Sequence, residues 1–136
     1  MRGERSVVPA RVLEPGECPG AVSDYFAALN GERWSLLEPL WHPDAVLRAP
    51  GTRPRTGRSE IMAYFRSLFE PWSSHRDEPT RVLVAEDTVV VEVEFAGVTR
   101  SGVKLTFDAV DIFDLRDGII TTLTTWYDLN WLRKQI

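Results

Sequence analysis

Four aspartates occur within the segment 105–118, LTFDAVDIFDLRDG, whose other residues are typical of a buried strand and its turn. Because side chains alternate between the two faces of a strand, Asp111 shares a row with Phe107 and Phe113 and is the only polar residue in it. Burying a charged carboxylate without a partner costs several kcal/mol, and the group commonly responds with a raised pKa. Asp111 is therefore a candidate general acid.

The other three aspartates favour structural or solvated positions. Asp108 and Asp114 share the opposite, more mixed face with Arg116, and Asp117 precedes a glycine in the turn. For Asp111 a structural role is the alternative: a buried acid held by a helix end or an arginine, or one returned to solvent by a β-bulge.

A second candidate, Tyr25, lies on the apolar side of a helix expected over 21–31. Val22, Phe26 and Leu29 repeat at helical spacing with it, and an Asn-Gly pair supplies the stop. This helix hides the tyrosine on its apolar face, where the hydroxyl is available to a buried site.

Two further helices are expected before the sheet. One covers 32–41, where Pro39 should kink or shorten it, and the other covers 58–72, where Pro71 ends it. Between them, a short strand is expected around 45–49.

After Pro79 the pattern changes from helical to extended. Segment 80–98 holds two strands around a tight turn at Glu86 and Asp87, and 102–132 holds two longer strands around a hairpin turn at 117–118. Helices followed by an antiparallel meander predict an α+β domain. We expect a cone-shaped, curved, mostly antiparallel sheet wrapped around three N-terminal helices.

Composition limits the classes of function. The 136 residues suffice for one domain, expected at 21–136, after a flexible arm at 1–20 that carries three prolines and three glycines. The net charge of −4 and the scattered basic residues argue against nucleic acid as a partner. No apolar run approaches a membrane span, and the lone Cys18 fits a reducing compartment, so we expect a cytoplasmic protein.

Several other side chains are candidates for substrate binding. Arg48, on the short strand, has the chemistry to clamp an anionic or carbonyl group, although a surface ion pair is the simpler interpretation. His42 and His75 are too isolated for a metal site, so no metal is expected, and His75 is retained as a substrate contact. Aromatic residues in excess of one small core tend to line a cavity: Trp41, Tyr64, Phe65, Trp126 and Tyr127.

Over about 20–132 the chain resembles the ketosteroid isomerases and SnoaL-like polyketide cyclases of the nuclear-transport-factor-two-like superfamily. The resemblance rests on YFAALNGERWSLLEPLWHPDAVLRAPGTRPRTG and DIFDLRDGII. It implies a cystatin-like α+β barrel and a homodimer, which we expect to form through the outer face of the sheet. It also places Tyr25 and Asp111 on the pair that donates hydrogen bonds to the developing enolate in the isomerases. The position of the isomerase base is occupied by Ala49, which cannot remove a proton.

The sequence and this resemblance together predict a cofactor-free enzyme acting on an apolar oxygenated small molecule. A polyketide cyclase, or a related isomerase or dehydratase of secondary-metabolite and antibiotic biosynthesis, is preferred, with Asp111 as acid or base. One alternative is a ligand-binding or assembly module without catalysis. Another is an epoxide hydrolase, which would hold water among two acids and an arginine, with Asp108 poorly placed as the second acid. A cavity of several hundred Å³ with converging polar groups would favour an enzyme over a self-filled scaffold.

Overall fold

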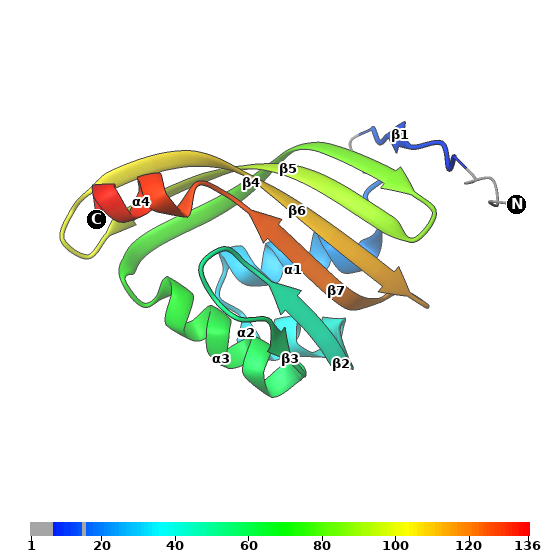
Figure 1. Cartoon of the computed structure of the whole chain (residues 1–136), viewed down its shortest axis with the longest axis horizontal. Helices are drawn as coiled ribbons and strands as arrows, with labels where there is room; N and C mark the ends of the chain where they lie inside the picture. The colour runs from blue at the N-terminus through cyan, green and yellow to red at the C-terminus, as the bar shows by residue number, and fades with distance from the viewer. Residues whose placement is uncertain (1–6, 15) are drawn as a thin grey trace, which may run out of the picture.

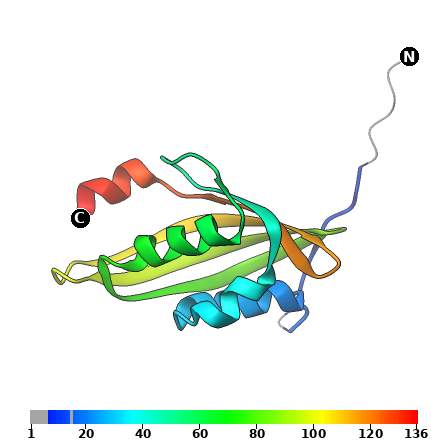
Figure 2. The same ribbon diagram turned by 90° about the horizontal axis from the view of Figure 1, so that it is seen from below.

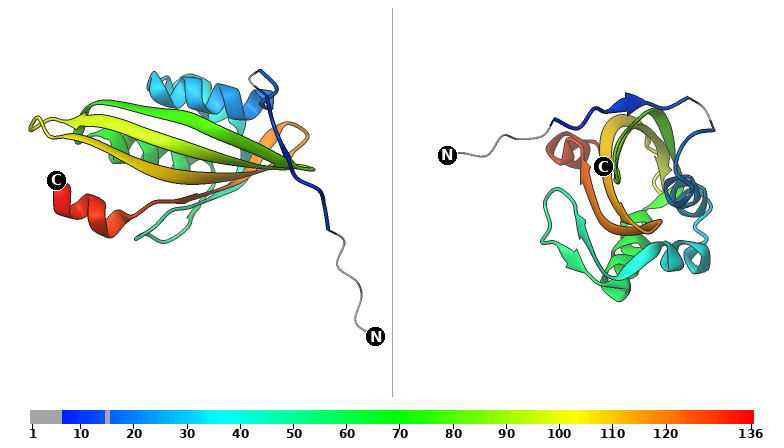
Figure 3. Two further views of the ribbon diagram at one scale, coloured as in Figure 1. Left: turned by 90° about the horizontal axis from the view of Figure 1, so that it is seen from above. Right: turned by 90° about the vertical axis from the view of Figure 1, so that its right-hand side faces the viewer.

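The computed structural model of the chain describes residues 7–14 and 16–136. A seven-stranded sheet runs in the order β1-β4-β5-β6-β7-β2-β3 and curves without closing. Helices α1 and α3 lie on its concave side, and Figure 3 shows the sheet bending around them. The expected α+β architecture, with a curved sheet wrapped around N-terminal helices, is confirmed.

The first helices follow the apolar spacing of the sequence. Helix α1 spans Gly20–Asn30 and α3 spans Arg58–Phe69, and each buries one apolar face against the sheet. The single helix expected over 32–41 is wrong in its extent. Helix α2 covers only Trp34–Leu37, and a short 3₁₀ turn, η1, covers Glu38–Leu40, because Pro39 cannot continue the α-helical hydrogen bonds.

Strand β2 takes up the chain directly after η1 and spans Trp41–Arg48, so it starts earlier than the expected 45–49. It pairs parallel with β7, and the two-residue β3, Arg55–Thr56, closes that edge.

The meander consists of β4 Trp72–Ala85, β5 Thr88–Thr99, β6 Lys104–Arg116 and β7 Ile119–Trp126. Its turns are those expected: Glu86 and Asp117 adopt positive φ angles of 53° and 52°, as tight hairpin turns require.

Strand β4 begins at Trp72 rather than after Pro79. The register with β5 shifts between Pro79 and Arg81, and such an irregularity accommodates a residue that cannot donate to the ladder. Segment 72–79, which includes His75, is therefore strand, although the extended pattern in the sequence begins only after Pro79.

A fourth helix, α4 Leu129–Gln135, was not expected. The side chain of Asp128 caps it by accepting a hydrogen bond of 2.9 Å from the backbone N–H of Trp131. Helix α4 packs closely over Gly51, which has a positive φ of 71°. A side chain at this position would collide with Leu129 at the start of α4. Figure 2 shows α4 near the end of the sheet opposite to the N-terminal strand.

Within the expected N-terminal arm, the short strand β1, Arg11–Val12, pairs antiparallel with β4 at the sheet edge. Residues 1–6 and 15 lie outside the described residues. In the part of the chain that the structure describes, no helix has the length and apolar character needed to cross a membrane.

Candidate active site

Asp111 lies on the concave face of β6, as its alternation predicts. Its Cα pairs in register with Val91 on β5 and Thr125 on β7, and the residue is only 5% exposed. Burial raises the pKa of Asp111 to about 6, and the hydroxyl of Thr125 partly opposes this by favouring the charged form. The carboxyl group can therefore carry a proton near neutral pH.

A second acid, Asp77, faces the same space from β4. The side chain of Asn30 grips its backbone: Nδ2 donates to the carbonyl oxygen of Asp77 at 2.9 Å, and Oδ1 accepts from its N–H at 2.8 Å. Burial, with a further contribution from the charge of Asp111, raises the pKa of Asp77 to about 7. The last residue of α1, Asn30, thus holds in place the backbone of Asp77, whose carboxyl faces the cavity.

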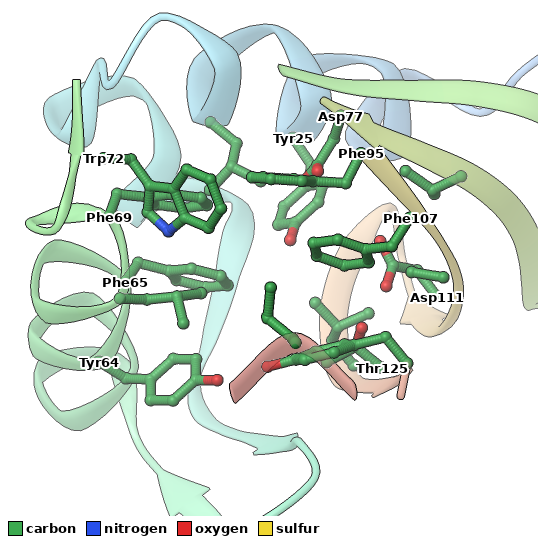
Figure 4. A pocket seen from close by; sticks show the side chains of 17 residues that line it. Tyr25, Tyr64, Phe65, Phe69, Trp72, Asp77, Phe95, Phe107, Asp111 and Thr125 are labelled. Atoms are coloured by element: carbon green, nitrogen blue, oxygen red, sulfur yellow. The ribbon is translucent and has the colours of Figure 1, made fainter. Parts of the chain in front are cut away.

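Tyr25 projects from α1 into the same region and is 3% exposed. Its ring contacts Phe26 and Phe113 edge to face, with 5.0 Å between ring centroids in both pairs. Burial raises the pKa of Tyr25 well above its ordinary value, and the charges of Asp111 and Asp77 raise it further. The hydroxyl therefore stays protonated and is available as a hydrogen-bond donor. Figure 4 shows Tyr25, Asp77 and Asp111 facing the same space.

These groups line one cavity of about 80 Å³ between α1, α3, the sheet and α4. Aromatic side chains form most of its wall (Figure 4). The lining residues are Tyr25, Leu29, Tyr64, Phe65, Leu68, Phe69, Trp72, Asp77, Val93, Phe95, Phe107, Ala109, Asp111, Leu123, Thr125, Tyr127 and Leu132. The volume is well below the several hundred Å³ set out as favouring an enzyme, whereas the polar groups do converge.

Three of the expected substrate contacts line the cavity. Tyr64 and Phe65 reach it from α3, and Tyr127 reaches it from the segment after β7. Burial raises the pKa of both Tyr64 and Tyr127. The Tyr64 hydroxyl interacts with that of Tyr127, so the two rings form a polar edge to an otherwise apolar wall.

The other expected contacts lie elsewhere. Trp41 is fully buried in the core behind the cavity, where its ring packs against Tyr25 and Phe65. Arg48 is an exposed residue at the end of β2 and is absent from the cavity lining. Trp126 faces the outer side of the sheet and is 55% exposed, which follows from its alternation with Tyr127.

The two histidines also lie outside the cavity wall. The side chain of His75 is only 3% exposed and stacks on Phe69 with 3.9 Å between ring centroids, while Nε2 lies 3.2 Å from Oε2 of Glu32. His42 accepts a hydrogen bond of 3.0 Å at Nδ1 from the backbone N–H of Asp44, a local turn contact. His75 therefore supports the wall from behind.

Asp77 is the site residue that the sequence analysis missed. Its segment, SSHRDEP, is polar on both faces and ends in proline, so it shows no alternation and is typical of a loop. One feature of the sequence pointed toward Asp77: Asn30 ends a helix, and its side chain needs backbone hydrogen-bond partners. The sequence does not indicate which strand supplies those partners. Ala49, at the position of the isomerase base, is not part of the cavity lining, and Asp77 is the second carboxyl instead.

Solved structures with similar folds include proteins of several activities. One is a protein with a ketosteroid isomerase-like fold from Catenulispora acidiphila in complex with trimethylamine: 20% identity, TM-score 0.79, covering 86% of this chain and 92% of that one. A candidate polyketide cyclase from Xanthomonas campestris matches at 20% identity and TM-score 0.79, covering 85% and 93%. An epoxide hydrolase of the LEH-like type from M. tuberculosis matches at 19% identity and TM-score 0.73, covering 86% of each chain.

At these identities the similarity shows a shared fold and leaves the reaction open. Among curated proteins, none matches the sequence. The family model of the SnoaL-like domain, by contrast, matches residues 22–123, which is most of the chain. The protein therefore belongs to the SnoaL-like domain family.

Proposed function

We propose that the protein is a cofactor-free enzyme that uses Asp111 and Asp77 as an acid/base pair on a small oxygenated substrate. The reaction type that we favour is that of a polyketide cyclase, or of a related isomerase or dehydratase, in secondary-metabolite biosynthesis. The observation that best supports this is the presence of two buried carboxyls, with pKa values of about 6 and about 7, in one aromatic cavity. Such groups populate both protonation states near neutral pH, which acid/base catalysis requires.

The roles follow from the protonation states. In an aldol-type ring closure, the ionised carboxylate removes a proton from the carbon next to a carbonyl group. The resulting enolate attacks a second carbonyl, whose oxygen takes a proton from the other carboxyl. Tyr25, which stays protonated, donates a hydrogen bond to the oxygen on which negative charge develops. Asp77 thereby supplies the second carboxyl of the pair, which Ala49 cannot provide.

The volume of the cavity limits the substrate. Typical ligand pockets measure roughly 300–1,000 Å³, whereas this cavity measures about 80 Å³. A long polyketide chain would enter only if the side chains at the edge of the cavity, Tyr64, Tyr127 and Leu132, moved apart. The same small volume is what favours the alternative of a ligand-binding module without catalysis.

The second acid also favours a further candidate, epoxide hydrolysis. Asp77 meets the requirement for two acids facing one space, which Asp108 on the outer face does not. The arginine of that arrangement is missing, however, since the cavity lining contains no arginine among the described residues. We therefore rank hydrolysis below carbonyl chemistry.

The test is product formation by wild type, Asp77→Asn and Asp111→Asn, with linear poly-β-ketone precursors and simple epoxides as substrates, measured by liquid chromatography and mass spectrometry. Cyclised or dehydrated product from wild type and its loss in both variants would support the proposal. Hydrolysed epoxide without cyclisation would favour the second candidate. Specific binding of a precursor without turnover at any pH from 5 to 9 would contradict both and favour the binding module.

A further inference from the structure

The charges around the cavity do not balance. Its lining contains two carboxyl groups, Asp77 and Asp111, and no lysine, arginine or histidine among the described residues. Two cationic groups outside the lining act on its tyrosines: the guanidinium of Arg55 stands 5.5 Å from the ring centroid of Tyr64, and the charge of Arg133 lowers the pKa of Tyr127 against the effect of burial. Neither carboxyl takes part in an ion pair within the described residues, so the negative charge that each carries when ionised is uncompensated inside the cavity.

The rest of the wall is also suited to positive charge. Eight aromatic residues line the cavity, namely Tyr25, Tyr64, Phe65, Phe69, Trp72, Phe95, Phe107 and Tyr127. Phe95 stacks on Phe107 with 4.6 Å between ring centroids, and Trp72 meets Phe95 edge to face at 4.8 Å. Figure 4 shows the labelled rings arranged around a common centre. The faces of aromatic rings carry negative electrostatic potential and attract cations, most strongly where water is excluded.

We propose that this cavity binds a small organic cation, a compact alkylammonium group, between its aromatic wall and the carboxyls of Asp77 and Asp111. The inference rests on the proposed function, because it names the class of substrate, an amine-bearing molecule, that would occupy the same site. A neutral apolar ligand would pack against the aromatic rings, but it would leave the two desolvated carboxyls without a positive charge to stabilise their ionised forms. A cation satisfies the rings and the carboxyls together.

Size selects the kind of cation. The cavity of about 80 Å³ has room for about two to three water molecules, which is too little for a metal ion with a full hydration shell. An ammonium group whose nitrogen is methylated carries its charge under methyl groups, so it loses little hydration and packs against aromatic rings. Any larger remainder of the molecule would pass outward between Tyr64, Tyr127 and Leu132.

Binding of such a cation changes the chemistry of the acids. A positive charge beside a carboxyl favours its ionised form, so the pKa values of Asp77 and Asp111 should fall when the cation binds. The ionised base of the pair would then be populated at a lower pH, and Tyr25 would remain protonated as a hydrogen-bond donor.

The test uses tetramethylammonium chloride as the probe and tert-butanol, a neutral molecule of similar size and shape, as the comparison, at constant ionic strength. Binding is followed by NMR through the indole N–H of Trp72 and the carboxyl carbons of Asp77 and Asp111. No turnover is needed. We expect tetramethylammonium to bind at least about tenfold more tightly than tert-butanol, as several cation–π contacts and two carboxylates would give. Affinity should rise between pH 5 and pH 8 as the two acids ionise.

Variants assign the effect to the acids. The double variant Asp77→Asn/Asp111→Asn is nearly isosteric with wild type and should lose both the preference for the cation and its pH dependence. Persistence of the pH dependence in this variant would assign it to groups other than the two acids and contradict the proposal. The control Asp108→Asn removes a carboxylate from the exposed outer face and should bind as wild type does. Melting curves establish that each variant is folded, and the pH series on wild type stands without any variant.

Equal binding of the two probes, or no binding of tetramethylammonium at Trp72, would overturn the inference. That result leaves the proposed function standing if Asp111→Asn still abolishes turnover of a neutral precursor. Conversely, tight cation binding in a protein that turns over no substrate would support the inference and contradict the proposed function.

Discussion

The acidic residues on the two faces of the sheet differ in their interaction partners. On the outer face Asp114 accepts hydrogen bonds from the hydroxyls of Thr88 and Thr122, and Glu92 pairs with Arg81. On the inner face, Asp111 and Asp77 have no cationic partner among the residues that the structure describes, and they lie among aromatic rings. Asp111 and Asp114 stand on one strand only three residues apart, so their surroundings distinguish them rather than their residue type or strand. At Asp111 water is lost without the gain of a cationic partner among the described residues, and this loss raises its pKa.

The largest expected effect separates these two aspartates by the same substitution. Asp111→Asn should lower the rate of product formation about 10² to 10⁴-fold, because the amide cannot transfer the proton, while stability is kept or improved. Asp114→Asn should leave the rate near that of wild type and lower the free energy of unfolding by about 1 kcal/mol, because one threonine hydroxyl loses its acceptor.

Rates on an accepted precursor and denaturant unfolding curves for both variants measure this contrast. If Asp111→Asn unfolded much more easily while its folded fraction turned over at the wild-type rate, Asp111 would be structural. The comparison between the two faces would then fail.

The next effect concerns the donor beside the acids. Tyr25→Phe should lower the rate about 10² to 10³-fold, as the loss of one donor to an oxyanion commonly does. The double variant with Asp111→Asn should lose less than the product of the two single losses, because both groups act on one charge centre. Tyr64→Phe, at the edge of the cavity, is the matched control and should be much milder. Independent, multiplying losses in the double variant would show that the two groups act at separate steps.

A smaller effect should appear in stability as a function of pH. The folded state keeps protons on Asp77 and Asp111 up to pKa values of about 7 and about 6, whereas the ordinary aspartate value is 3.8. Between these values the folded state binds more protons than the unfolded state, so the free energy of unfolding should fall as the pH rises from about 4 to 7. At about 1.4 kcal/mol per pKa unit, raised pKa values of about 6 and about 7 give a total fall on the order of several kcal/mol.

Denaturant curves at a series of pH values for wild type and Asp77→Asn/Asp111→Asn measure this fall. The double variant should lose most of the slope in that window. Asp111→Asn alone should also lower the pKa of Asp77, because the charge of Asp111 contributes to raising it. An unchanged slope in the double variant would place the titrating groups outside the cavity.

The sequence predicted which residues face the cavity only where apolar and polar residues alternate along the whole strand. Asp111 stands out because Phe107 and Phe113 flank it in one row, and the curved sheet follows from the order of helices and strands. Asp77 could not be found in this way, since His75 and Asp77 are the inward residues of a stretch that is polar on both faces. Its role depends on contacts with Asn30 and with the charge of Asp111, which are distant in sequence.

The cavity volume was equally beyond the sequence. The volume depends on how closely α4 packs against Gly51 and on how far Leu132 extends into the cavity. Both are set by tertiary packing rather than by local sequence. Composition gave a surplus of aromatic residues but not their distribution, so Trp41 was assigned to the cavity although it fills the core behind it.

The smallest expected effect on the chemistry comes from the outer face itself. Trp126 is 55% exposed there, close to Val110 in a shallow groove, and an exposed indole of this kind is typical of a contact surface. We predict that this face joins two copies of the chain. Trp126→Ser should then shift the equilibrium toward monomers by removing an aromatic anchor, without changing the pKa values of Asp77 and Asp111, which lie on the opposite side of the sheet.

Sedimentation velocity over a concentration series measures the association, and the carboxyl NMR titration measures the pKa values of the two acids. Lys104→Ser, a polar substitution at the start of β6 away from Trp126, is the control and should leave association unchanged. A wild-type protein that remains monomeric at high concentration would contradict the dimer, and a shifted Asp111 titration in Trp126→Ser would show that the two faces are coupled through the sheet.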